Sequence, residues 1–264
     1  MSTAALTADR AVSVFGPAIR FLMVAGSAGI LVGVPAGLLS RAIMKVGALA
    51  AGPALIGVHT ANGNAVGDFT ASGTLALVIV AGVIPAIGAA LLYVSVRQWL
   101  LPLGRWRGLA LGAYGLALTG FGVVLEPGNN DFVRFGPAAL NVAMFAALFI
   151  AVGIALAPVA EALLRVAEHP SPGQVVLLWP GLLLAAFVTF ALGVGGTAGA
   201  WTARTRGEHF GGADAAALLF WSVAIGLLAQ RSGTGRPFGL AMLAVLLACG
   251  TWLTAGAIRI LLVG

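Results

Sequence analysis

The residues of this chain that could do chemistry lie mainly in three short polar stretches between long apolar runs. The stretches are "HTANGNAVGDFT" (59–70), "EPGNNDFVRFG" (126–136) and "TARTRGEHFGGAD" (202–214). Imidazole and carboxylate groups bind divalent cations and polar solutes. The candidate ligands are His59, Asp68, Glu126, Asp131, Glu208 and His209. Their spacing matches no known ligand pattern, so solvated turns built from Asn, Asp and Gly are the favoured interpretation.

Between these stretches the chain lacks the groups that most membrane chemistry requires. No Asp, Glu, Lys or His lies near the middle of any apolar run, where a proton relay would place one. The single lysine, Lys45, lies near the end of a run, and the single cysteine, Cys249, can form neither a disulfide framework nor a cysteine metal site within one chain. HExxH, P-loop and GxSxG motifs are missing as well. We therefore expect no enzymatic activity and no cofactor.

Composition indicates a membrane protein. Of the 264 residues, 60% are hydrophobic and 8% are charged, against roughly 25% charged in a soluble domain. The mean hydropathy is +1.05. The net charge of +6 comes from 14 Lys and Arg spread along the chain, which form no basic patch. A lipid bilayer is thus the expected partner, and nucleic acid is not.

A helix needs about 20 apolar residues to cross the hydrocarbon core. Uncharged stretches near this length predict an all-α membrane bundle of about seven transmembrane helices in a single integral membrane domain, 1–264. The predicted spans are 20–43, 72–96, 108–125, 137–160, 174–200, 213–230 and 237–260. Six spans remain an alternative, because Asp214 and Arg231 leave the sixth only a short uncharged core.

Arginines in short loops predict the orientation of the chain, because Lys and Arg resist translocation. Arg97, Arg105 and Arg107 lie between the second and third spans, and Arg231 and Arg236 lie between the sixth and seventh. Both loops are expected in the cytoplasm, which places the N-terminus inside and the three polar stretches outside. Asn62-Gly63 predicts a short extracytoplasmic β-hairpin between the first two spans.

Three segments carry a resemblance to a known family. They are "TANGNAVGDFT", "GTLALVIVAGVIPAIGAALLYVSVRQWLLP" and "EPGNNDFVRFGPAALNVAMFAALF", within residues 20–165. Together they resemble a family of polytopic membrane proteins of actinobacterial type to which no function is assigned. The resemblance implies a multi-pass protein of a bacterial cytoplasmic (inner) membrane, and it implies no activity.

Small residues recur at helical spacing in two spans. Gly29, Gly33 and Gly37 repeat every four residues in the first, and Thr189, Gly193 and Thr197 do so in the fifth. Such spacing lets helix backbones approach closely in lipid, where no hydrophobic force drives packing. It favours a non-enzymatic structural or accessory subunit of a membrane assembly, with a membrane-protein partner or a second copy of the chain.

The alternative is a permease or channel for a small solute or an ion. Its extracytoplasmic entrance would be formed by His59, Asp68, Glu126, Asp131 and His209.

Overall fold

The computed structural model describes residues 3–55, 57–59, 70–124, 136–168, 170–208, 210–231 and 236–263. Nearly all of these residues are helical, and the described part contains no strand. The predicted all-α class is therefore confirmed. The predicted β-hairpin at Asn62-Gly63 falls within residues 60–69, outside the described residues.

The helices follow one another with short connections. In chain order they are α1 (Thr3–Ala51), η1 (Pro53–Leu55), α2 (Ala71–Leu77), η2 (Val78–Val83), α3 (Ile84–Leu100), η3 (Leu101–Trp106), α4 (Arg107–Val124), α6 (Ala138–Glu168), α7 (Pro172–Phe190), η4 (Ala191–Gly196), α8 (Thr197–Thr205), α9 (Gly212–Arg231) and α10 (Arg236–Val263). The segments η1 and η3 are 3₁₀ turns. By contrast, η2 and η4 are π-helical and continuous with the α-helices on either side.

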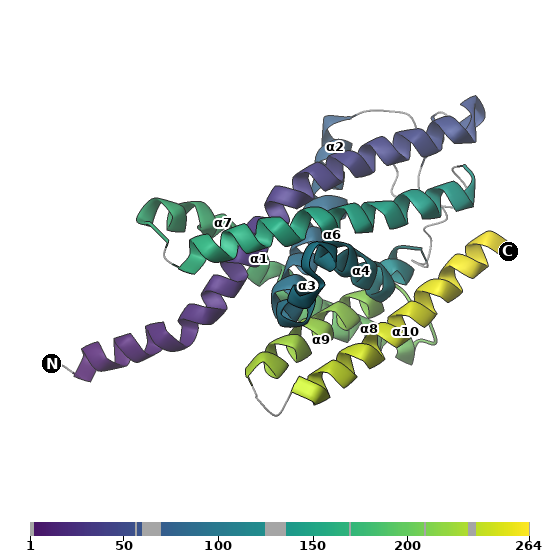
Figure 1. The fold of residues 1–264 in the computed structure, drawn as a ribbon. Coiled ribbons are helices and arrows are strands. Elements are labelled where there is room, and N and C mark those ends of the chain that lie inside the picture. Colours follow the sequence, from purple (N-terminus) through teal and green to yellow (C-terminus); the bar gives the residue numbers. More distant parts are fainter. Residues whose placement is uncertain are drawn as a thin grey trace.

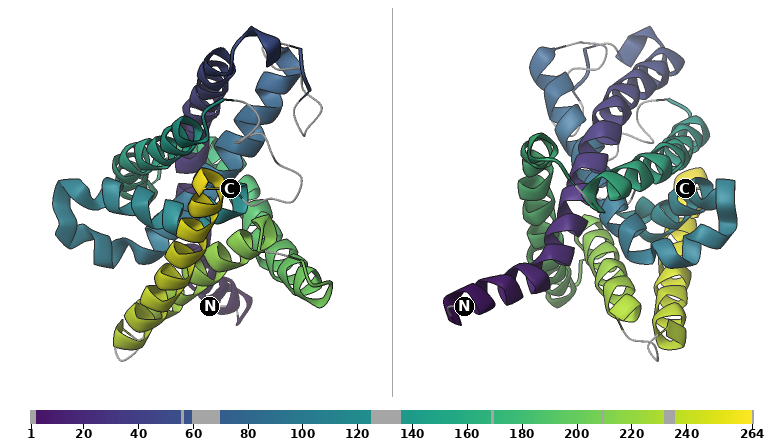
Figure 2. Two further views of the ribbon diagram at one scale, coloured as in Figure 1. Left: turned by 90° about the vertical axis from the view of Figure 1, so that its right-hand side faces the viewer. Right: turned by 60° about the vertical axis from the view of Figure 1, so that its left-hand side comes forward.

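Helix α3 forms the centre of the molecule and is seen nearly end-on in Figure 1. It packs against α1, α6 and α9, and its residues Ile87, Leu91, Leu92 and Tyr93 are fully buried. Helices α7 and α10 lie at the periphery, as the two further views in Figure 2 also show. The helices around α3 thus shield its side chains from the surroundings of the protein.

In the part of the chain that the structure describes, six helical stretches are long and apolar enough to cross a membrane: Gly16–Ala51, Ala71–Gly122, Ala138–Glu168, Gly173–Thr205, Gly212–Gln230 and Pro237–Leu262. The predicted count of seven is not reproduced. The reason lies in residues 101–106, which were expected as a loop but form the 3₁₀ turn η3. This turn, which kinks at the non-helical residue Gly104 (φ 54, ψ −120), joins the predicted second and third spans into one stretch of 52 residues.

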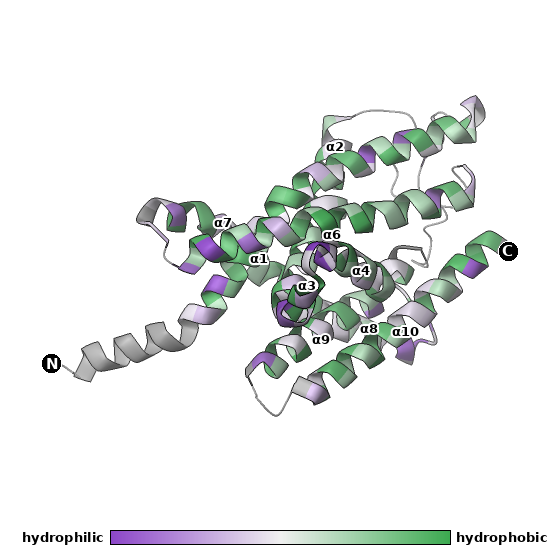
Figure 3. Cartoon of the chain, viewed as in Figure 1, coloured by the Kyte–Doolittle hydropathy of each residue, from purple (hydrophilic) through white to green (hydrophobic). Residues whose placement is uncertain are grey.

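Large apolar side chains cover the outside of these helices. Leu177, Leu183 and Phe187 on α7 and Trp252 on α10 are all exposed. Figure 3 shows hydrophobic residues, in green, recurring along the coloured parts of the helices. Exposed apolar side chains around whole helices are expected when lipid is the solvent.

Local sequence explains where several helices begin. Ser171 caps α7: the backbone N–H of Gln174 donates to its hydroxyl, and the backbone N–H of Ser171 donates to the Gln174 side chain, forming a capping box. Pro172 follows at the first position, where no N–H is needed. Thr70 caps α2 by accepting a hydrogen bond from the N–H of Gly73.

Candidate functional site

A charged cluster forms where α3, α4 and α6 meet. Tyr93 and Arg97 are four residues apart on α3, so their side chains share one face of that helix. Glu161 faces them from α6, and Arg107 is the first residue of α4. The cluster therefore joins α6 to the two consecutive helices α3 and α4.

Glu161 is held by three short hydrogen bonds. Arg97 donates from Nε to Oε1 at 2.6 Å and from Nη2 to Oε2 at 2.7 Å, which is the bidentate geometry of a strong guanidinium–carboxylate pair. Tyr93 donates its hydroxyl to Oε1 at 2.7 Å. The side chain of Glu161 is 10% exposed and that of Arg97 is 38% exposed. Both carboxylate oxygens are engaged, which suits a fixed connection between helices better than a proton relay or a metal ligand.

Arg107 adds a second positive charge to this cluster. Its Nη1 lies 4.0 Å from Glu161 Oε1, within ion-pair distance but too far for a hydrogen bond. One carboxylate thus faces two guanidinium groups, and the three side chains carry one net positive charge.

The predicted arginine loop is divided between helices in the structure. Arg97, expected in a cytoplasmic loop, lies in the last turn of α3 and reaches Glu161. Arg105 lies in η3 over the ring of Trp106, with its guanidinium carbon 5.1 Å from the ring centroid. Glu161 directly follows the predicted fourth span, 137–160, and no sequence pattern predicts its partners. The four-residue spacing of Tyr93 and Arg97 is the sequence feature that indicates a polar face on this helix.

The predicted outer ligands are only partly described. His59 is exposed after η1, and Glu208 is exposed with its Oε1 3.8 Å from Arg206 Nη1. Asp68, Glu126, Asp131 and His209 lie outside the described residues. Among the residues that the structure describes, no group of three His, Cys, Asp or Glu could hold a metal ion. An outer binding site thus stays a prediction.

A second ion pair joins α8 to the start of α9. Arg204 Nη2 lies 2.8 Å from Asp214 Oδ2, which also accepts a hydrogen bond from the N–H of Gly211. The Arg204 guanidinium lies 4.1 Å from the ring centroid of Phe210. These contacts fix a helix connection, since Asp214 satisfies a backbone donor at the beginning of α9.

The glycine face of α1 is occupied within the chain. A methyl group on Gly33 or Gly37 would lie 2.5 Å from the Cα of Val83 or Val78 in the second helical stretch, and one on Gly29 would meet Ile87. The absence of side chains thus allows α1 to lie directly on the backbone of η2. A partner protein has to use another face.

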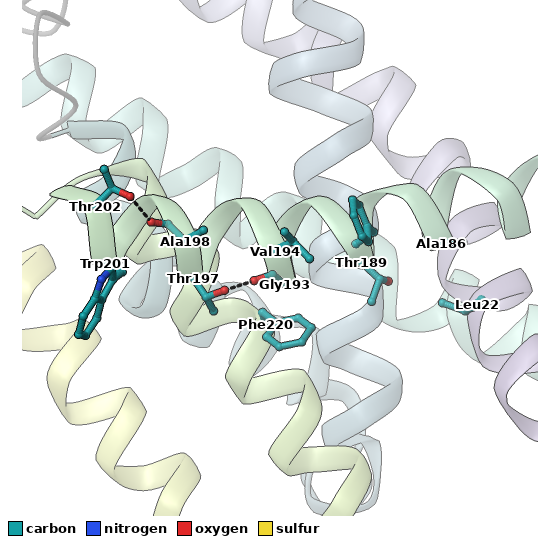
Figure 4. A pocket seen from close by; sticks show the side chains of 11 residues that line it. Leu22, Ala186, Thr189, Gly193, Val194, Thr197, Ala198, Trp201, Thr202 and Phe220 are labelled. Carbon is teal, nitrogen blue, oxygen red and sulfur yellow. Dashed lines mark hydrogen bonds between the residues drawn. The ribbon is translucent and has the colours of Figure 1, made fainter. Parts of the chain in front are cut away.

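A second surface, beside η4, is open to the surroundings of the protein. A groove of about 890 Å³ is lined by Leu22, Ala186, Thr189, Phe190, Gly193, Val194, Thr197, Ala198, Trp201, Thr202 and Phe220. Figure 4 shows Thr197 and Thr202 donating to the carbonyls of Gly193 and Ala198 on their own helix. Thr189 likewise donates to Ala185, at 2.7 Å. Because these hydroxyls are already satisfied, the groove presents a mainly apolar surface that includes the small residues Gly193 and Ala198.

The fold and these sites define the chain as an all-α protein whose helices are suited to cross a membrane several times. No protein-family model, curated protein or solved structure matches it.

Proposed function

We propose that the chain is a non-enzymatic multi-pass protein of a bacterial cytoplasmic membrane, acting as a structural or accessory subunit of a larger assembly. The groove beside η4 carries this proposal. Its lining combines the aromatic residues Phe190, Trp201 and Phe220 with the small residues Gly193 and Ala198, and it is open to the surroundings of the protein. Small residues between aromatic walls suit a transmembrane helix of a partner, because helix association in lipid depends on close packing.

The polar groups of the helices support packing over permeation. Thr119, Thr189 and Ser222 each donate to the carbonyl one turn earlier in their own helix. Glu161 is closed off by Arg97 and Tyr93. Groups engaged in this way offer few free donors or acceptors to a permeating solute.

The proposed threading, meaning the order and direction in which the chain crosses the membrane, has seven crossings and a cytoplasmic N-terminus. Its support is the reversal at Gly104 (φ 54, ψ −120) in η3, which divides the 52-residue stretch into two arms. In this threading the inner side carries eight arginines and the outer side six basic residues. The inner ones are Arg10, Arg20, Arg97, Arg105, Arg107, Arg165, Arg231 and Arg236, and the outer ones are Arg41, Lys45, Arg134, Arg204, Arg206 and Arg259. That excess of arginine agrees with the positive-inside rule.

The subunit proposal is tested by blocking the groove. The protein is purified from its native membrane in mild detergent, and bound proteins are quantified by mass spectrometry. We expect a partner in fixed stoichiometry that is lost in Ala198→Trp and kept in Val176→Trp, a matched change at an exposed position of α7 outside the groove. A chain that purifies alone, or a complex that survives Ala198→Trp, would contradict the proposal.

Crosslinking provides a readout that does not depend on a bulky substitution. The chain has one cysteine, so Cys249→Ser gives a background for a single probe. A crosslinker on Val194→Cys, in the groove, should capture the partner, whereas one on Leu177→Cys, exposed on α7, should not. Capture of a second copy of the chain from Val194→Cys would identify the assembly as a homo-oligomer.

A permease or channel is the second candidate. The π-helical segments η2 and η4 favour it, because single π turns within α-helices occur often at functional sites. For this candidate, purified protein in liposomes should pass small cations, and Asp68→Ala or Asp131→Ala should change the flux without changing assembly. Absence of flux in the unmodified protein would eliminate it.

A further inference from the structure

The turn between α3 and α4 brings two arginines and a tryptophan to one end of the molecule. The chain reverses at Gly104, and Arg105, Trp106 and Arg107 follow directly. Both adjoining arms belong to a stretch that is apolar enough to cross a membrane. In the proposed seven-crossing threading, the turn lies where these arms leave the hydrocarbon and meet the headgroups.

The charge at this turn is not neutralised within the described part of the chain. Glu161 already accepts two hydrogen bonds from Arg97 and one from Tyr93, so it can offer Arg107 only a contact of 4.0 Å. The Arg107 side chain is still 27% exposed. Arg105 lies over Trp106, and no acidic side chain among the described residues is within ion-pair distance of it.

Apolar side chains surround these two cations. Trp106 is 56% exposed, and Leu101, Leu103 and Leu109 are exposed beside it. Tryptophan is enriched at the headgroup level of membranes, where one side of the ring is apolar and the other is wet. A ligand that fits both the arginines and the apolar side chains carries a negative charge and a hydrocarbon chain.

We infer that Arg105 and Arg107 bind the phosphate of an anionic phospholipid headgroup, while Trp106 and the neighbouring leucines contact the upper part of its acyl chains. Guanidinium groups match phosphate geometry through paired N–H donors. The anionic lipids of a cytoplasmic leaflet attract basic residues at the membrane surface. This inference rests on the proposed threading, with the turn at the cytoplasmic surface, but not on the subunit role, because the site lies on η3 and α4, whereas the groove lies on α1, α7, η4, α8 and α9.

Native mass spectrometry of the full-length protein in neutral detergent tests this inference. The protein is titrated with phosphatidylglycerol, with phosphatidylcholine and with inorganic phosphate. We expect selective retention of phosphatidylglycerol, weakened about fivefold by Arg107→Ala and by Arg105→Ala, since one basic residue near an anionic surface contributes about 1 kcal/mol. Arg206→Ala, which removes an exposed arginine from the end of α8, should leave retention unchanged.

Three results would overturn the inference. They are equal retention of the two lipids, an equal loss of affinity in Arg206→Ala, and binding of inorganic phosphate as tight as that of the lipid. If Arg107→Ala fails to fold, Arg105→Ala decides, because Arg105 is exposed, lies over Trp106 and forms no ion pair with a described acidic residue.

Discussion

At the scale of single residues, the clearest feature is the carboxylate of Glu161 between two arginines and a tyrosine. Buried charges are tolerated when they are paired and hydrogen-bonded. Removing one member of a buried pair is costly, because the other charge stays behind without compensation. The Glu161–Arg97 pair thus fixes the position of α6 relative to α3, which apolar packing alone would leave less well defined.

Glu161→Gln should destabilise the protein by about 2 kcal/mol, less than a fully buried pair would lose, because Arg97 is partly exposed. The substitution keeps the shape of the side chain but leaves Arg97 and Arg107 facing each other without a carboxylate. Thermal unfolding in detergent measures the effect. Glu208→Gln, at an exposed carboxylate, is the control and should change little. Equal losses in both variants would show that the cluster has no special role.

Tyr93→Phe isolates the hydroxyl of the same cluster. It removes one hydrogen bond to Glu161 and leaves the bidentate contact with Arg97, so we expect a loss of about 1 kcal/mol. The same unfolding assay applies. In the double variant Tyr93→Phe with Glu161→Ala, the two effects should not add, because Glu161→Ala alone already removes the acceptor of that hydrogen bond. Strict additivity would contradict the geometry.

At the scale of elements, the approach of α1 to η2 depends on glycine. The backbones lie so close that a single methyl group at Gly33 would overlap the Cα of Val83. A neighbouring backbone cannot turn aside as a flexible side chain can, so the helices themselves must separate.

Gly33→Ala should therefore lower the unfolding midpoint clearly, whereas Gly256→Ala should keep or raise it. Nothing lies within 4 Å of a Cβ at Gly256, and alanine is the better helix former by about 1 kcal/mol. Both changes add one methyl group to a membrane-length helix, which makes them a matched pair. Equal behaviour of the two variants would mean that the packing of α1 on η2 is not as close as described.

At the scale of the whole molecule, the number of crossings decides where the C-terminus lies. The turn at Gly104 gives seven crossings if both arms span the membrane, and six if Ala71–Gly122 crosses once. With a cytoplasmic N-terminus, an odd number places the C-terminus outside.

Reporter fusions to the C-terminus distinguish the two arrangements. We expect alkaline phosphatase fused after Gly264 to be active, since this enzyme matures only outside the cytoplasm, and a reporter inserted at Gly104 to be inactive. An inactive C-terminal fusion together with a folded cytoplasmic reporter at that end would contradict the seven-crossing threading.

The sequence by itself determined that this is a helical chain suited to a membrane, because composition and the length of uncharged runs act locally and need no tertiary contacts. It also identified Gly29, Gly33 and Gly37 as a helix face of small residues. Only the tertiary structure decided that this face lies on η2 and that Arg97 reaches Glu161 across 64 positions of chain. It also decided that residues 101–106 form the 3₁₀ turn η3, with a kink at Gly104. These features depend on which helices become neighbours, and in a chain that is apolar on nearly every face, hydrophobic patterning does not encode that choice.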